Sequence, residues 1–122
     1  MDMAVYKMVH MLGLVLLFQS LGASLLVTLS GMDTSAFSNA KMARIMHGVG
    51  IVLILVGGFG MMARLGISWP LPIWIWIKLI IWIVLGLVLT IVKKKPESTR
   101  LWWTLVIVFG ALAAYLGGFK PF

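Results

Sequence analysis

Residues 73–92 read IWIWIKLIIWIVLGLVLTIV, and this stretch decides the fold. Its twenty residues match the roughly 20 apolar residues that a helix needs to cross a hydrocarbon core about 30 Å thick. Three lysines and Pro96 follow at once, and the proline cannot continue the helix. A single charged residue, Lys78, interrupts the stretch. The sequence therefore predicts a transmembrane helix that carries one cation inside the membrane.

Three further apolar runs have the same character, with spans roughly at 4–30, 39–66 and 99–118. The connections between them are short and rich in turn residues, including Gly31, Pro70 and Pro72, and Ser98 is expected to cap the last helix. Short connections make neighbouring helices antiparallel. We therefore predict an all-α integral membrane protein, an antiparallel four-helix transmembrane bundle in one membrane domain over residues 1–122.

Composition supports a membrane protein and excludes several other classes. Of 122 residues 62% are hydrophobic and 11% charged, whereas roughly 25% are charged in a typical soluble domain. The net charge of +7 comes mostly from Lys and Arg at span ends, where they meet lipid head groups, so we expect no nucleic-acid partner. The absence of cysteine excludes disulfides and thiolate metal sites within this chain. Asp2 stands where a signal peptide has basic residues, so we expect the first span to be retained.

The distribution of Lys and Arg predicts the orientation. One side of the membrane carries six of them and the other side three, and cytoplasmic loops are the richer in positive charge. Both connections after the first and third spans are therefore expected inside, and both termini outside the cytoplasm. The six are Lys41, Arg44, Lys93, Lys94, Lys95 and Arg100, and the three are Lys7, Arg64 and Lys120.

Three ionisable side chains, His10, His47 and Lys78, lie within the spans and are therefore functional candidates. With a helix rise of about 1.5 Å per residue, His10 and Lys78 lie at nearly one depth, toward the outer side. His47 lies about 18 Å from His10 along the membrane normal, so one haem held by both is not expected. Together with Arg64, His10 and Lys78 predict an outward-facing pocket for a flat anionic ligand. The imidazole would meet a metal or proton, and the cations would meet carboxylates.

Trp74 and Trp82 lie four residues either side of Lys78 and share its helix face, where they can stack on a flat ring or pack among lipids. Small residues on the His10 side of the first span and on the His47 side of the second span permit close helix packing and also leave room for a planar cofactor. Simpler interpretations remain open for the polar groups. Each histidine can hydrogen-bond a neighbouring helix, and Lys78 can extend toward the outer interface. The small residues are Gly13, Ser24, Thr28, Ala43, Gly50, Gly57 and Gly58.

Short motifs in all four spans carry a resemblance to known families. They are Lys7-x-x-His10, Arg44-x-x-His47, Trp76-x-Lys78-Leu79 and Tyr115-x-Gly117. The chain resembles the small SirB-type membrane proteins and, more distantly, HemJ-type protoporphyrinogen oxidases and the CopD membrane domain.

The HemJ-type likeness implies a first-helix histidine and a third-helix lysine associated with b-type haem, roles that fall on His10 and Lys78, with His10 as the metal ligand. The SirB-type pattern adds His47 as a second-helix histidine. The further histidines and tyrosines of the HemJ-type third and fourth helices are absent here, which bears against porphyrinogen oxidation more than against haem or porphyrin binding. The resemblance also implies a bacterial inner membrane.

The sequence suggests two main functions. The first is a haem b or porphyrin binder with a redox role, with His10 as ligand, Lys78 and Arg64 near propionates, and His47, Trp74 and Trp82 as further cofactor-binding candidates. The second is a non-catalytic accessory subunit, packed against other membrane subunits or against copies of itself, for example in a respiratory complex. A third, solute or copper transport, rests on the CopD likeness alone. Whether the protein is an enzyme stays open.

Overall fold

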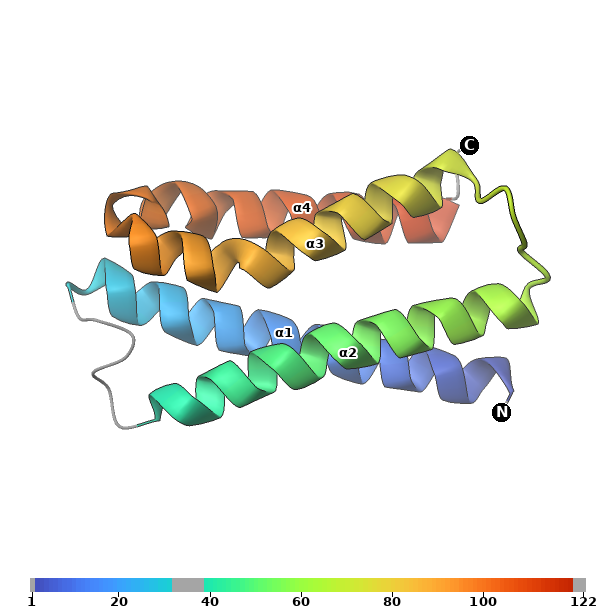
Figure 1. The fold of residues 1–122 in the computed structure, drawn as a ribbon, viewed down its shortest axis with the longest axis horizontal. Coiled ribbons are helices and arrows are strands. Elements are labelled where there is room, and N and C mark those ends of the chain that lie inside the picture. The colour runs from blue at the N-terminus through green and yellow to red at the C-terminus, as the bar shows by residue number, and fades with distance from the viewer. Residues whose placement is uncertain (1, 32–38, 120–122) are drawn as a thin grey trace.

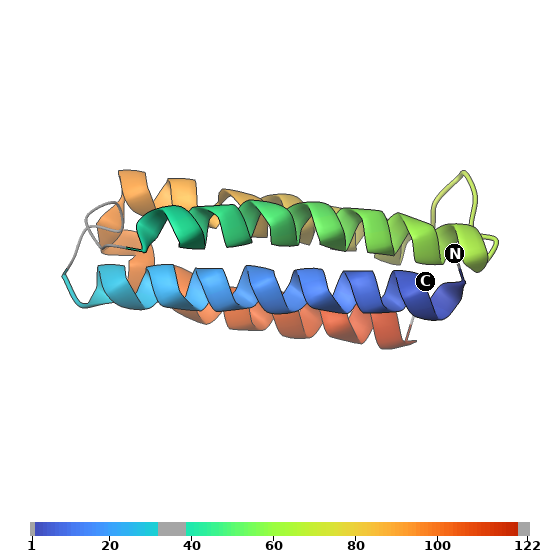
Figure 2. The ribbon, with the colours of Figure 1, turned by 90° about the horizontal axis from the view of Figure 1, so that it is seen from below.

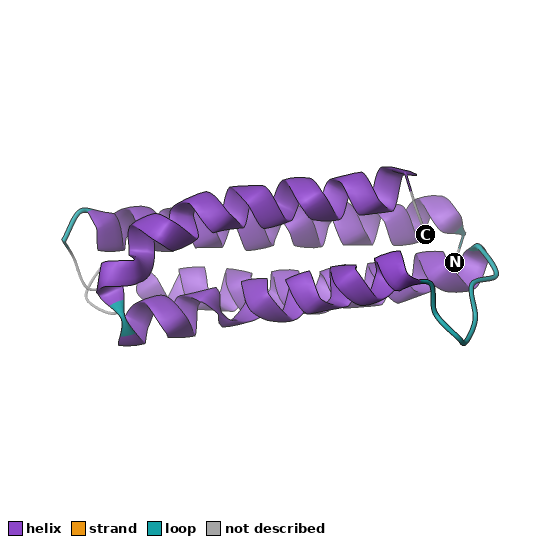
Figure 3. Ribbon diagram, turned by 90° about the horizontal axis from the view of Figure 1, so that it is seen from above, coloured by secondary structure: helices purple, strands orange, loops and turns teal. Residues whose placement is uncertain are grey.

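The computed structural model describes residues 2–31 and 39–119, and the described chain is helical apart from its connections (Figures 1 and 3). No β-strand occurs in these two ranges. The prediction of an all-α protein with four long helices is confirmed, with helix bounds within two residues of those expected. The helices are α1 (Met3–Leu29), α2 (Ala40–Arg64), α3 (Ile73–Lys94) and α4 (Thr99–Phe119), and a short 3₁₀ turn, η1 (Pro96–Ser98), precedes α4.

Local chemistry explains where the helices begin and end. Asp2 caps α1 by accepting a hydrogen bond from the Val5 N–H at 3.1 Å. Gly66 adopts φ +74° just after α2, a left-handed conformation that suits glycine and ends the helix. The residue before a proline avoids helical angles, so α3 continues through Lys94 and stops at Lys95.

Ser98, the expected cap of the last helix, directly precedes α4 and is the last residue of the 3₁₀ turn η1. Its hydroxyl donates to the Lys95 carbonyl at 2.7 Å. The Thr99 hydroxyl likewise donates to the Pro96 carbonyl at 2.6 Å. Both hydroxyl groups thus bond back to the turn that Pro96 starts.

The four helices lie side by side, and the chain reverses direction at each connection (Figure 1). α1 packs closely along the length of α2, as Figure 2 shows from below. The backbones of α2 and α3 approach each other at only a few positions. The fold therefore has one tight helix pair and a wider space between α2 and α3.

Glycines make the α1–α2 contact tight. A Cβ atom added to Gly13 would lie 2.8 Å from the Gly50 carbonyl oxygen, and one added to Gly57 would lie 2.7 Å from the His10 Cα. On the same face, Gly60 makes room for the ring of Tyr6. These distances leave no space for side chains, so the small residues serve close packing between these helices.

The larger apolar core lies on the other side of α1, among α1, α3 and α4. Its fully buried members include Leu17 and Leu21 of α1 and Val88 of α3, joined by Leu116 of α4. Each of the four helices is long and apolar enough to cross a membrane, judged by length and composition.

An interhelical site at His10 and Lys78

Two cavities meet at His10 and Lys78, which line both together with Ile54 and Trp82. The first cavity lies mainly between α2 and α3, has a volume of about 170 Å³ and extends to Leu65. We call it the α2–α3 cavity. The α1–α4 cavity is larger, at about 420 Å³. Its other lining residues are Leu14, Leu17, Phe18, Ile81, Leu85, Val106, Ile107, Gly110, Ala111, Ala113 and Ala114. Among the described residues that line either cavity, Lys78 is the one formal cation and there is no carboxylate.

The imidazole of His10 bonds to a carbonyl on another helix. Its Nδ1 lies 2.9 Å from the carbonyl oxygen of Ile54 in α2. A carbonyl only accepts hydrogen bonds, so Nδ1 donates and carries the hydrogen. The neutral ring then keeps a lone pair on Nε2, which is the arrangement that orients a histidine to bind a metal or accept a proton.

Two adjacent glycines expose that carbonyl. Helical side chains tilt toward the N-terminus, so the residues three and four positions after Ile54 would cover its carbonyl oxygen. Those residues are Gly57 and Gly58. A Cβ on Gly58 would lie 3.6 Å from Nδ1 and 3.7 Å from Cε1 of His10, so the ring lies directly against this glycine. The glycine pair thus forms the seat of the His10 ring.

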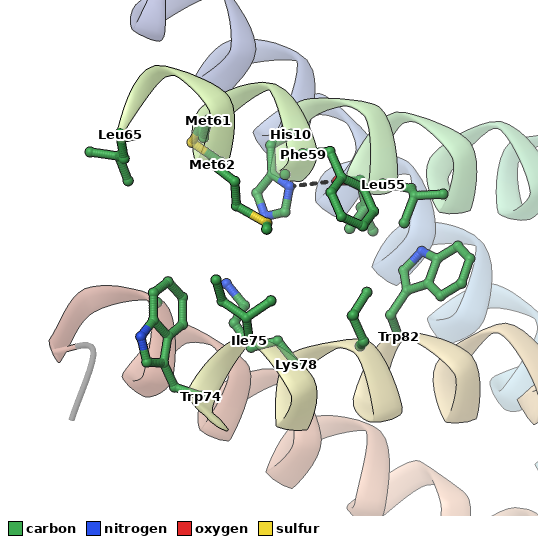
Figure 4. A pocket seen from close by; sticks show the side chains of 14 residues that line it. His10, Leu55, Phe59, Met61, Met62, Leu65, Trp74, Ile75, Lys78 and Trp82 are labelled. Atoms are coloured by element: carbon green, nitrogen blue, oxygen red, sulfur yellow. Dashed lines mark hydrogen bonds between the residues drawn. The ribbon is translucent and has the colours of Figure 1, made fainter. Parts of the chain in front are cut away.

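The Lys78 ammonium occupies space left by a glycine of α4. A Cβ added to Gly117 would lie 2.7 Å from Lys78 Nζ, closer than such atoms approach. Figure 4 shows His10 and Met62 extending toward α3, from which Trp74, Lys78 and Trp82 extend in return. His10 and Lys78, which the sequence predicts at one level, therefore both line each of the two cavities.

Both predicted tryptophans line the α2–α3 cavity, on either side of Lys78 (Figure 4). Trp74 is buried, with 8% of its surface exposed. Trp82 is half-buried, and its Nε1–H donates to the Ile51 carbonyl at 3.0 Å. Trp82 thus bridges α3 to α2 where their backbones lie apart.

The structure does not bring Arg64 into this site. Arg64 is the last residue of α2, is exposed, and lines neither cavity. The sequence placed it near the right level but could not assign its direction around the helix. Lys78 is therefore the cation that lines the cavities, among the residues that the structure describes.

His47 also lies away from the cavities. Its Nε2 lies 3.3 Å from the Leu85 carbonyl of α3, to which it donates. Ten residues of α2 separate it from Gly57, which lies beside His10, so the two histidines are about 15 Å apart along the helix. His47 and Trp82 together form a reciprocal pair of bonds between α2 and α3.

Several lining residues were not predicted from the sequence. Phe59, Met61 and Met62 line the α2–α3 cavity near His10, and Gly117 shapes the place of Lys78. The Gly57–Gly58 pair was a usable signal, because two successive glycines in an apolar helix uncover a carbonyl. Gly117 stands out in the sequence only within the motif Tyr115-x-Gly117, which does not predict this role, since the role depends on contact with another helix.

Among the described residues that line the two cavities, His10 provides the one imidazole. In residues 2–31 and 39–119, no three His, Asp or Glu side chains come together as a metal-binding group. Comparisons with protein families, curated proteins and solved structures find no match to this chain.

Proposed function

We propose that this protein is an antiparallel four-helix transmembrane bundle that binds a tetrapyrrole, haem b or a free porphyrin, where its two cavities meet. It lies in a bacterial inner membrane with both termini outside the cytoplasm. The observation that carries the proposal is the His10 Nδ1–H bond to Ile54, because it leaves Nε2 as a lone-pair donor beside two apolar cavities.

The surroundings of His10 match the chemistry of such a ligand. A tetrapyrrole is a flat apolar ring with carboxylate side chains, and it needs apolar walls and a cation. Trp74, Trp82 and Phe59 supply aromatic surface, and Lys78 supplies the positive charge for a propionate. The α1–α4 cavity alone lies within the range of about 300–1,000 Å³ typical of small-molecule sites.

His10 and Lys78 would have different roles in binding the tetrapyrrole. His10 would hold the iron through Nε2, with Ile54 fixing its tautomer and the glycine seat fixing its ring plane. Lys78 would neutralise a propionate within hydrocarbon, where an unpaired charge is costly. A haem held in this way would supply one-electron chemistry, and the thioether of Met62 lines the same α2–α3 cavity.

The test is the absorption spectrum of the full-length protein, purified in detergent and titrated with hemin. We expect a Soret band that saturates at one equivalent and shifts on reduction. His10→Ala should lose most of this band, because the variant lacks the Nε2 ligand. Lys78→Met keeps the apolar stem and should weaken hemin binding about tenfold, because it removes a charge-assisted bond.

A matched control separates ligand loss from misfolding. His47→Ala removes an imidazole that lines neither cavity and should keep most of the Soret absorbance. Hemin binding that is equal in wild type, His10→Ala and Lys78→Met would refute the proposal. A colourless protein that co-purifies with a larger membrane assembly would favour the accessory-subunit interpretation instead.

A further inference from the structure

The α1–α4 cavity extends along the bundle beyond His10 and Lys78, the two side chains at which a flat ring would be held. It begins at His10 and Lys78 and continues to Leu17 of α1 and Leu85 of α3. Both Leu17 and Leu85 lie seven residues further along their helices, so the cavity extends about 10 Å along the bundle. One end thus carries an imidazole and an ammonium, and the rest is hydrocarbon.

The same cavity opens sideways between α1 and α4. Ile107 lines it and yet has 63% of its surface exposed. Ala111 and Ala114 also line it and are exposed. The backbones of α1 and α4 touch sparsely, and Phe18 packs against Gly110 across their boundary. A molecule dissolved in the bilayer therefore reaches the cavity without passing through water.

We infer that the α1–α4 cavity binds a long-chain fatty acid, with its carboxylate at Lys78 and the first half of its hydrocarbon chain along Leu17, Phe18 and Val106. The occupant follows from charge and shape: one cation at the end of an elongated apolar space selects a single-chain amphiphile with an anionic head. No Asp or Glu stands among the described lining residues to repel the carboxylate.

This inference rests on the membrane location proposed above and not on tetrapyrrole binding. Haem and fatty acid would share Lys78 but differ in their other contacts. Phe59, Met62 and Trp74 line the α2–α3 cavity only, whereas Phe18, Val106 and Ala114 line the α1–α4 cavity only. Substitutions in one cavity can therefore be distinguished from substitutions in the other.

The experiment is photo-crosslinking of the full chain in nanodiscs with a diazirine derivative of palmitic acid, followed by peptide mapping. We expect labelling concentrated at residues 11–18 and 106–114, with competition by unlabelled palmitate. The corresponding diazirine alcohol should label these positions about tenfold less, because it lacks the charge-assisted bond to Lys78. Lys78→Met should reduce labelling by the acid to the level of the alcohol.

Two variants test the cavity itself. Ala114→Phe places a large ring in the α1–α4 cavity and should suppress labelling there. Ala23→Phe makes the same change at an exposed position of α1 that lines neither cavity, and should label as wild type. Equal labelling by acid and alcohol, or labelling spread over all lipid-facing segments without competition, would overturn the inference. Palmitate labelling without a Soret band would uphold it and refute the proposed tetrapyrrole site.

Discussion

The His10 ring donates a hydrogen bond from Nδ1 to the Ile54 carbonyl of the neighbouring helix, at 2.9 Å. That carbonyl belongs to a helical turn whose next residues include Gly57 and Gly58, and the backbone of His10 lies directly against Gly57. One packing contact thus places the histidine, selects its tautomer and presents Nε2 to the cavities.

Gly57→Ala should destabilise the α1–α2 pair. The added Cβ would lie 2.7 Å from the His10 Cα and Cβ, and neither atom can move without shifting the helix. Such overpacking typically costs about 1–3 kcal/mol. Thermal melting in detergent, followed by circular dichroism, measures the effect. Gly48→Ala is the matched control, since a Cβ there meets nothing within 4 Å and alanine favours the helix. Equal melting of the two variants would contradict the packing argument.

Gly117→Ala should weaken anion binding without unfolding the protein. The new Cβ would lie 2.7 Å from Lys78 Nζ, and this flexible end can move aside while keeping its charge. Displacing the ammonium should lower the affinity for hemin or palmitate about three- to tenfold, which is the scale of one hydrogen bond. Gly118→Ala adds the same methyl group in open space and should bind as wild type. Identical affinities would show that the position of Lys78 does not matter.

His47→Ala should lower the thermal stability of the protein and leave most of its cofactor binding intact. The variant loses the bond to the Leu85 carbonyl, and interhelical hydrogen bonds in membranes average about 0.6 kcal/mol. Trp82→Phe loses the companion bond to Ile51, and because both bonds join α2 to α3, the double variant should depart from additivity. Melting of the two single variants and the double variant measures the coupling. Strict additivity would mean that the two bonds act independently.

Cysteine labelling should place both termini outside the cytoplasm. The chain has no native cysteine, so single substitutions report cleanly. We expect Ser68→Cys, exposed in the connection between α2 and α3, to react with an impermeant maleimide added outside intact cells. Ser98→Cys should react only after the membrane is opened. Ser38, in the connection expected on the same side as Ser98, lies outside the described residues and offers a second inside probe. Labelling of Ser98→Cys in intact cells, with Ser68→Cys protected, would show that both termini lie inside the cytoplasm.

The number and bounds of the helices could be predicted from the sequence. Apolar length and breaker residues such as Pro96 act locally, so the number of helices and their bounds were readable within two residues. The common level of His10 and Lys78 was readable for the same reason, because helix rise per residue is fixed. Orientation and ligand remain predictions.

Only the tertiary structure decided which side chains share a space. The rotation of each helix about its axis depends on how all neighbouring side chains pack together. This packing leaves Arg64 and His47 outside the cavities and brings Met62 to the wall of the α2–α3 cavity. The same packing made Gly57 the seat of one functional side chain and Gly117 the place of another. A glycine acquires such a role only through a second helix, and spacing along one chain carries no record of that contact.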